Sequence, residues 1–142
     1  MIASEACVDL IKRSEGFRMR PYADPAGLLT IGYGHKCCAA VGIVTEDEAD
    51  LLLRRDLANV EEQVSSIVKV PLTQGQFDAL CDFTFNLGYG RLASSTLLKL
   101  LNAGNYAAAA AEFPKWDLCS GEPSPGLYRR RMAERQMFER AA

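Results

Sequence analysis

Several features that mark other protein classes are scarce in this chain of 142 residues. It has one histidine, one tryptophan and a formal net charge of −2, which argues against a general nucleic-acid role but leaves room for a local basic patch. No segment approaches the roughly 18 consecutive apolar residues of a membrane span. The first residues, MIASEACVDLIKRSEGF, hold acids at positions 5 and 9 and no continuous apolar stretch. We therefore expect no secretory signal, no stable membrane insertion, and a protein first retained in the cytoplasm.

Cysteine is present, but not in a pattern typical of a disulfide framework or a metal site. An odd number of cysteines without a signal peptide argues against structural disulfides, and no Cys-x-x-Cys pair suits zinc, so we expect no metal. Two of them lie on apolar helical faces and are expected in the core (Cys7 and Cys81). Cys37 and Cys38 lie near His35, which leaves a cysteine–histidine nucleophile as a minor alternative. The fifth is Cys119, and whether any of the five pair is left open.

The first third of the chain predicts a short helix followed by a hairpin. Residues 4–14 carry apolar residues at helical spacing after a capping Ser4, and Gly16 is suited to end the helix. The next residues, FRMRPYADPAGLLTIGYGH, are rich in Pro, Gly and β-favouring residues, and DPAG suits a type I turn. We expect a small antiparallel hairpin over residues 17–35, with a third short strand near 42–44.

The remainder of the chain predicts helices. Thr45 and Glu48 form a capping box at the start of a helix over about 46–69, and Thr73 and Gln76 form a second box ahead of the apolar FDALCDFTFNLG. The first of these helices would be roughly 30 Å long, enough to connect two lobes. The segment WDLCSGEPSPG predicts a loop before a last helix, LYRRRMAERQMFER.

Together these elements predict one domain over residues 1–142, of the α+β class and mainly helical. A small α/β lobe with a β-hairpin covers about 12–45, and the helix over 46–69 connects it to a helical lobe made of about 70–142 together with 1–11. A cleft between two lobes is a favoured place for a ligand.

Two carboxylates lie in the hairpin region. Glu15 ends the first helix, where the partial negative charge of the helix terminus disfavours an ionised carboxylate and so favours a proton donor. Asp24 begins the DPAG turn, and the hairpin folds it back towards the helix end. Taken alone, Glu15 is an exposed helix-end glutamate and Asp24 an acceptor of turn N–H groups. Taken together, two carboxylates in unlike environments are the arrangement that glycoside hydrolysis uses.

Other polar residues nearby also have two interpretations. Thr30 suits a strand, but its hydroxyl both donates and accepts hydrogen bonds and could hold a water. His35 could be a base, although a lone histidine among glycines is more often packed and hydrogen-bonded. The arginines at 129–131 could bind an anion or form a solvated helix face.

The spacing of three of these residues resembles a known family. Glu15, eight intervening residues, Asp24, five intervening residues and then Thr30 inside TIGYGH are similar to the catalytic residues of the phage lysozymes, or endolysins, of glycoside hydrolase family twenty-four, which includes the T-even phage lysozyme. The resemblance covers nearly the whole chain, because ALCDFTFNLGYG, STLLKLLNAGNY, EFPKW and PGLYRRRMAERQMF follow in the order and spacing of the family's C-terminal half.

The resemblance implies a lysozyme-like fold and endo-hydrolysis of the β-1,4 bond between N-acetylmuramic acid and N-acetylglucosamine in peptidoglycan, with inversion, to lyse the bacterial host. Glu15 would be the acid, and Asp24 would act with Thr30 on the water or stabilise positive charge. Asn86 would face the sugar, and Gly34 and His35 would be structural. One arginine of 129–131, with Arg129 as the first choice, would approach Glu15 and the substrate.

The resemblance also implies the setting of the reaction. It implies no cofactor, a monomer made in the host cytoplasm, and action in the periplasm on peptidoglycan glycan strands with the help of a separate holin.

Other functions stay open at the sequence level. A non-catalytic peptidoglycan-binding or virion structural module could share the fold. A lytic transglycosylase would cut the same bond with one acid and no water, which the pairing of Asp24 with Thr30 disfavours. A nucleic-acid binder using the arginine-rich last helix is a remote third possibility.

Overall fold

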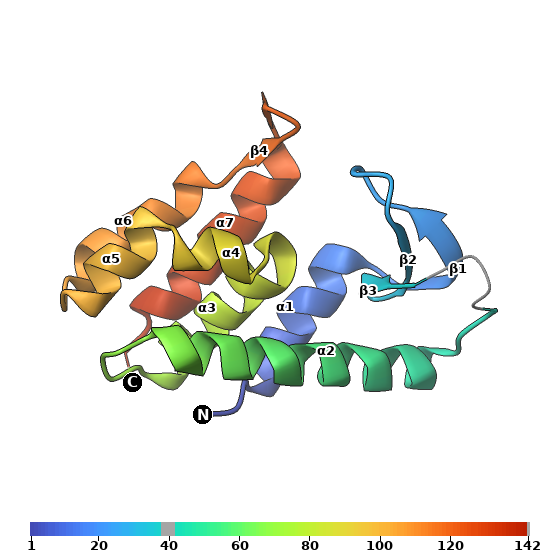
Figure 1. Cartoon of the computed structure of the whole chain (residues 1–142), viewed down its shortest axis with the longest axis horizontal. Helices are drawn as coiled ribbons and strands as arrows, with labels where there is room; N and C mark the ends of the chain where they lie inside the picture. The colour runs from blue at the N-terminus through green and yellow to red at the C-terminus, as the bar shows by residue number, and fades with distance from the viewer. Residues whose placement is uncertain (38–41, 142) are drawn as a thin grey trace.

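A computed structural model describes residues 1–37 and 42–141 of the chain. A three-stranded sheet lies at one end of the molecule, a group of helices lies at the other, and the long helix α2 runs beneath both (Figure 1). The predicted fold class, α+β and mainly helical, is confirmed. The elements are α1 (Glu5–Glu15), β1 (Arg18–Ala23), β2 (Leu29–Gly32), β3 (His35–Lys36), α2 (Glu46–Ile67), α3 (Gln74–Leu87), α4 (Tyr89–Ala93), α5 (Thr96–Asn102), α6 (Tyr106–Glu112), the 3₁₀ turn η1 (Phe113–Lys115), β4 (Leu118–Cys119), β5 (Glu122–Pro123) and α7 (Pro125–Glu139).

The small sheet is antiparallel, in the order β1-β2-β3. Its first turn is closed by the Asp24 N–H, which donates to the Leu28 carbonyl at 2.8 Å, and by the Gly27 N–H, which donates to the Asp24 carbonyl at 2.8 Å. The third strand expected near 42–44 is wrong, because the chain reverses earlier. Gly32 and Gly34 both adopt positive φ, which glycine tolerates at little cost, so β3 pairs with β2 directly.

Helix α2 begins where the sequence predicts and ends two residues earlier than predicted. Thr45 accepts a hydrogen bond from the Glu48 N–H, and Glu48 accepts from the Thr45 N–H, which completes the predicted capping box. Val68 is already extended. One face of the helix is buried along its length (Ala49, Leu53, Leu57, Val60 and Val64). The helix therefore packs under the sheet at one end and under the helical lobe at the other.

The helical lobe is built around α3. Every residue from Phe77 to Thr84 is buried, and α1, α2 and α7 all pack against this helix. Aromatic rings fill the centre, with Phe83 in edge-to-face contact with Phe113 and Trp116. Cys7 and Cys81 lie in this core with no exposed surface, as predicted.

The connections between the later helices differ from the prediction in two places. A short hairpin of β4 and β5 lies within the predicted loop WDLCSGEPSPG. Helix α7 begins at Pro125 and not at Leu127, because Ser124 caps it and a proline at the first helical position has no N–H to leave unpaired. Within residues 1–37 and 42–141, no helix is long and apolar enough to cross a membrane, and no group of three or more His, Cys, Asp or Glu side chains is placed to hold a metal ion. Cys38 lies outside the described residues.

Candidate active site

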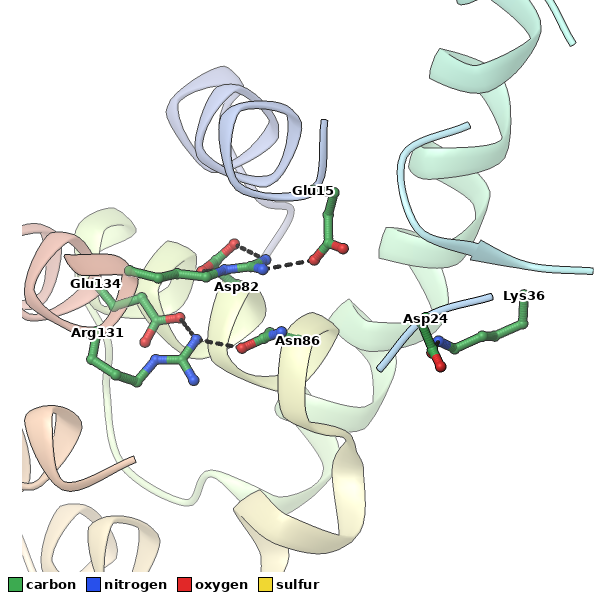
Figure 2. A network of polar contacts seen from close by, with 8 residues as sticks. Glu15, Asp24, Lys36, Asp82, Asn86, Arg131 and Glu134 are labelled. Atoms are coloured by element: carbon green, nitrogen blue, oxygen red, sulfur yellow. Dashed lines mark hydrogen bonds and ion pairs between the residues drawn. The ribbon is translucent and has the colours of Figure 1, made fainter. Parts of the chain in front are cut away.

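A cleft of about 530 Å³ lies between the sheet and the helical lobe. Its lining includes the three residues of the predicted catalytic set, Glu15, Asp24 and Thr30, together with Gly34 and Asn86. Figure 2 shows Glu15 and Asp24 on opposite sides of this space, with Asn86 reaching in from α3. The structure therefore brings four residues of the segment 15–34 together with Asn86, which is distant in the sequence. Two others predicted near the site, His35 and Arg129, do not line the cleft.

Glu15 ends α1 because Gly16 follows it in a conformation with φ of +72° that only glycine adopts easily. Its side chain is 19% exposed, and its Oε2 accepts a hydrogen bond from Arg130 Nη1 at 2.6 Å. Gly34 packs against the other oxygen, since a Cβ added there would lie 2.7 Å from Glu15 Oε1. The Glu15 carboxyl group is thus held between the Arg130 guanidinium and the backbone of Gly34, which has no side chain.

The arginine at Glu15 is Arg130, and the prediction of Arg129 is wrong. Successive helical residues point about 100° apart, so the members of the arginine run face different neighbours at this level of α7. Arg130 and Arg131 are both buried, but Arg130 is the one that contacts Glu15, and its Nε and Nη2 each donate to the carboxylate of Asp82 at 2.9 Å. Arg129 is exposed and lines grooves on the outer side of the helix.

Asp24 is held as a charged acceptor. Its Oδ1 accepts from the N–H groups of Ala26 and Leu28 at 2.9 and 2.8 Å, and its Oδ2 accepts from Lys36 Nζ at 2.7 Å. The Lys36 ammonium, followed by the Leu28 N–H, lowers the pKa of Asp24 below its ordinary value, because both stabilise the ionised form. An ionised carboxylate in this position can accept a proton from a water molecule.

Thr30 lies on β2 opposite Tyr22 of β1, lines the same cleft as Asp24 and is 1% exposed. Its Oγ1 donates to the Tyr22 carbonyl at 3.3 Å, which leaves the oxygen lone pairs able to accept a hydrogen bond from a molecule in the cleft. His35 has a different place, because its Nδ1 lies 2.8 Å from Asp56 Oδ2 of α2. It ties β3 to the long helix, as the structural interpretation of a lone histidine expects.

Behind the cleft lies a charged network that the sequence analysis missed (Figure 2). Arg130 bridges Glu15 and Asp82, while Arg131 donates through Nη2 to Glu134 Oε1 at 2.7 Å and to Asn86 Oδ1 at 2.9 Å. The sequence signal for this network was the presence of two acids within helical segments that also hold apolar residues. These acids are Asp82 in FDALCDFTF and Glu134, three residues after Arg131.

Two carboxyl groups of this network have oppositely shifted pKa values. Burial and the neighbouring carboxylate of Asp82 raise the pKa of Glu134 well above its ordinary value. Burial alone would raise the pKa of Asp82, but the positive charge of Arg130, together with hydrogen bonds from Glu134 and Arg130, lowers it below its ordinary value. Asp82 is therefore the ionised partner of Arg130, and Glu134 is the carboxyl group that retains a proton.

Comparison with known proteins places this geometry in a family. The family model for phage lysozyme matches residues 12–134. This chain belongs to the phage lysozyme family. As a member of that family and a relative of endolysins, it is a lytic muramidase, and the non-catalytic alternative is not favoured.

Related phage lysozymes align over nearly the full chain. The endolysin of Acyrthosiphon pisum secondary endosymbiont phage 1 is 45% identical over 146 residues, covering 99% of this chain and 100% of that endolysin. The endolysin of Salmonella phage P22 is 42% identical over 134 residues, covering 90% and 91%. Among solved structures, the muramidase domain of SpmX from Asticaccaulis excentricus superposes with a TM-score of 0.89 at 40% identity, covering 97% of both chains. A mutant of P22 lysozyme gives 0.83 at 38% identity, covering 97% of this chain and 98% of the other.

Proposed function

We propose that this lysozyme hydrolyses the β-1,4 bond between N-acetylmuramic acid and N-acetylglucosamine with inversion, using Glu15 as acid and Asp24 with Thr30 to direct a water. The observation that carries this assignment is the cleft itself, with a carboxyl group at the end of α1 on one side and a charged carboxylate beside a hydroxyl on the other. Inverting glycosidases place a water between two carboxyl groups, which requires roughly 6.5–9.5 Å between them.

In this mechanism the water oxygen attacks the anomeric carbon from the face opposite the leaving sugar. Asp24 takes one proton from that water, Thr30 accepts a hydrogen bond from it, and Glu15 gives its proton to the departing glycosidic oxygen. Arg130 stays in place throughout, since its other two bonds go to buried Asp82. It is therefore available to stabilise the Glu15 carboxylate that forms as the bond breaks.

The test is product analysis of digested peptidoglycan for the wild type and for Glu15→Gln, scored by mass and anomeric configuration. The wild type should give a free reducing end of inverted configuration, and the variant should lose roughly 10²–10⁴-fold in rate. Glu5→Gln is a matched control, because Glu5 lies on the same helix with its side chain 71% exposed and paired to Arg54. An anhydro-sugar product would indicate a transglycosylase, and cell clearing by Glu15→Gln would refute the catalytic assignment.

We also propose that the enzyme acts as a monomer in the periplasm, after a separate holin has opened the inner membrane. The proposed catalytic residues Glu15, Asp24 and Thr30 all line one cleft within a single chain, so the proposed reaction needs no residue from a second copy. Size-exclusion chromatography tests the oligomeric state. Expression in host cells with and without a holin tests the route, since lysis should require the holin.

A further inference from the structure

Arg131 is a fully buried arginine directly behind the cleft. It projects from α7, has no exposed surface, and shares its Nη2 group between Glu134, which is equally buried, and Asn86. Asn86 lies near the end of α3 and lines the cleft. Arg131 therefore connects the interior of the helical lobe to a residue on the wall of the active site.

The chemistry of the guanidinium group fixes which way the Asn86 amide points. A guanidinium has five N–H donors and no acceptor, so only the Asn86 oxygen can face it at 2.9 Å. The opposite orientation would place an NH₂ group against N–H donors. The Asn86 NH₂ group consequently points away from Arg131 and towards the space between Glu15 and Asp24 (Figure 2). No residue in the described part of the chain accepts a hydrogen bond from it.

The Arg131–Glu134 pair is poorly suited to a purely stabilising role. Among the residues that the structure describes, Arg131 Nε and Nη1 are buried without hydrogen-bond partners. Burying a guanidinium beside a carboxyl group that keeps its proton carries a desolvation penalty that their attraction does not cancel, and apolar replacements of similar volume are frequently neutral or stabilising. A role in orienting Asn86 accounts for a buried charge at this place.

We propose that Arg131, held by Glu134, is a positioning residue that fixes Asn86 as a hydrogen-bond donor to the glycan. This inference rests on the proposed function, because it requires a glycan in the cleft. The group that Asn86 recognises is a neutral acceptor on the sugar, either the carbonyl oxygen of a 2-acetamido group or a ring hydroxyl. Arg131 itself does not line the cleft and acts only through Asn86.

The sharpest test is Asn86→Asp compared with Asn86→Ala. Aspartate has nearly the same shape and keeps an acceptor for Arg131, but it offers only acceptors to the cleft. We expect kcat/KM on peptidoglycan to fall roughly 10- to 100-fold for both variants, since each loses one donor to the substrate. An Asn86→Asp enzyme with wild-type activity would overturn the inference. If Asn86→Asp keeps wild-type activity while Glu15→Gln is inactive, only this inference fails and the proposed catalytic function stands.

A second test separates positioning from packing. The double change Arg131→Met with Glu134→Leu replaces the buried pair with apolar side chains, and thermal unfolding shows whether the fold is kept. We expect kcat/KM to fall about 3- to 10-fold in the wild-type background, with no further fall when Asn86→Ala is already present, because residues that act through one contact are not additive. An equal fall in both backgrounds would show that the pair acts on the fold and not through Asn86.

The two acceptors are distinguished by N-deacetylated peptidoglycan. If Asn86 binds the acetamido carbonyl, the loss caused by Asn86→Ala disappears on this substrate. If it binds a hydroxyl, the loss persists at the same size.

Discussion

The contact between Gly34 and Glu15 makes a quantitative prediction about how closely the acid must be positioned. In Gly34→Ala the new Cβ would lie 2.7 Å from Glu15 Oε1, whereas ordinary contact begins near 3.4 Å. The carboxyl group must therefore move by about 0.7 Å if the backbone holds. A misplacement of about 1 Å at a reacting group can reduce the rate roughly 10²-fold, so we expect kcat to fall about 10- to 100-fold.

The backbone conformation of Gly34 adds an effect on stability that must be separated from the effect on activity. Its φ is +75°, where an alanine costs roughly 1–2 kcal/mol of folding free energy. Gly104 is the matched control, because its φ is +82° and no atom lies within 4 Å of an added Cβ. Gly104→Ala should lose a similar amount of stability and none of the activity of the folded enzyme.

The assay is kcat on a soluble glycan at saturating concentration, with chemical denaturation of both variants to measure stability. If Gly34→Ala loses stability but retains the kcat of Gly104→Ala, the Glu15 carboxyl group tolerates displacement. The reasoning that links its position to catalysis would then be refuted.

Two further predictions concern charge at the site. Replacing Lys36 with Met should raise the pKa of Asp24 towards its ordinary value, so the acidic limb of the kcat/KM profile should move to higher pH, while Lys99→Met, distant on α5, should leave it unmoved. If the acidic limb of the Lys36→Met profile does not move, the ionisation of Asp24 does not control kcat/KM. Replacing Arg130 with Met should cost about 3–5 kcal/mol by leaving a buried carboxylate unpaired, whereas exposed Arg129→Met should stay within about 0.5 kcal/mol. Chemical denaturation measures both, and equal losses would contradict the assignment of the inward-facing arginine.

The local signals in the sequence predicted much of the fold because they act over short distances. A capping box joins residues three apart, as at Thr45 and Glu48, and Gly16 ends a helix through its own φ, so both are readable from a few letters. The prediction that Glu15, Asp24 and Thr30 act together came from the resemblance of their spacing to the phage lysozyme family, and all three line the cleft.

The contacts behind the site could not be predicted in this way because they depend on helix phase and on distant partners. The bond from Arg130 to Glu15 joins residues 115 apart, and the choice among three consecutive arginines turns on where α7 begins. The start at Pro125, two residues earlier than predicted, reflects the cap provided by Ser124. The apolar neighbours of Asp82 and the arginine three residues before Glu134 mark these acids in the sequence, but they do not identify the contacts that the acids make with other turns and other helices.

The protonated state of Glu134 also links folding to the solution around it. In an unfolded chain this carboxyl group would ionise above about pH 4.5, while the native interior keeps its proton to a much higher pH. Within that window the native protein binds one proton more than the denatured chain, so this group makes stability decline as the pH increases. Refolding at a pH within that window should thus withdraw a proton from the buffer. Calorimetry in two buffers of different ionisation enthalpy would record that uptake as a difference in the apparent heat of folding.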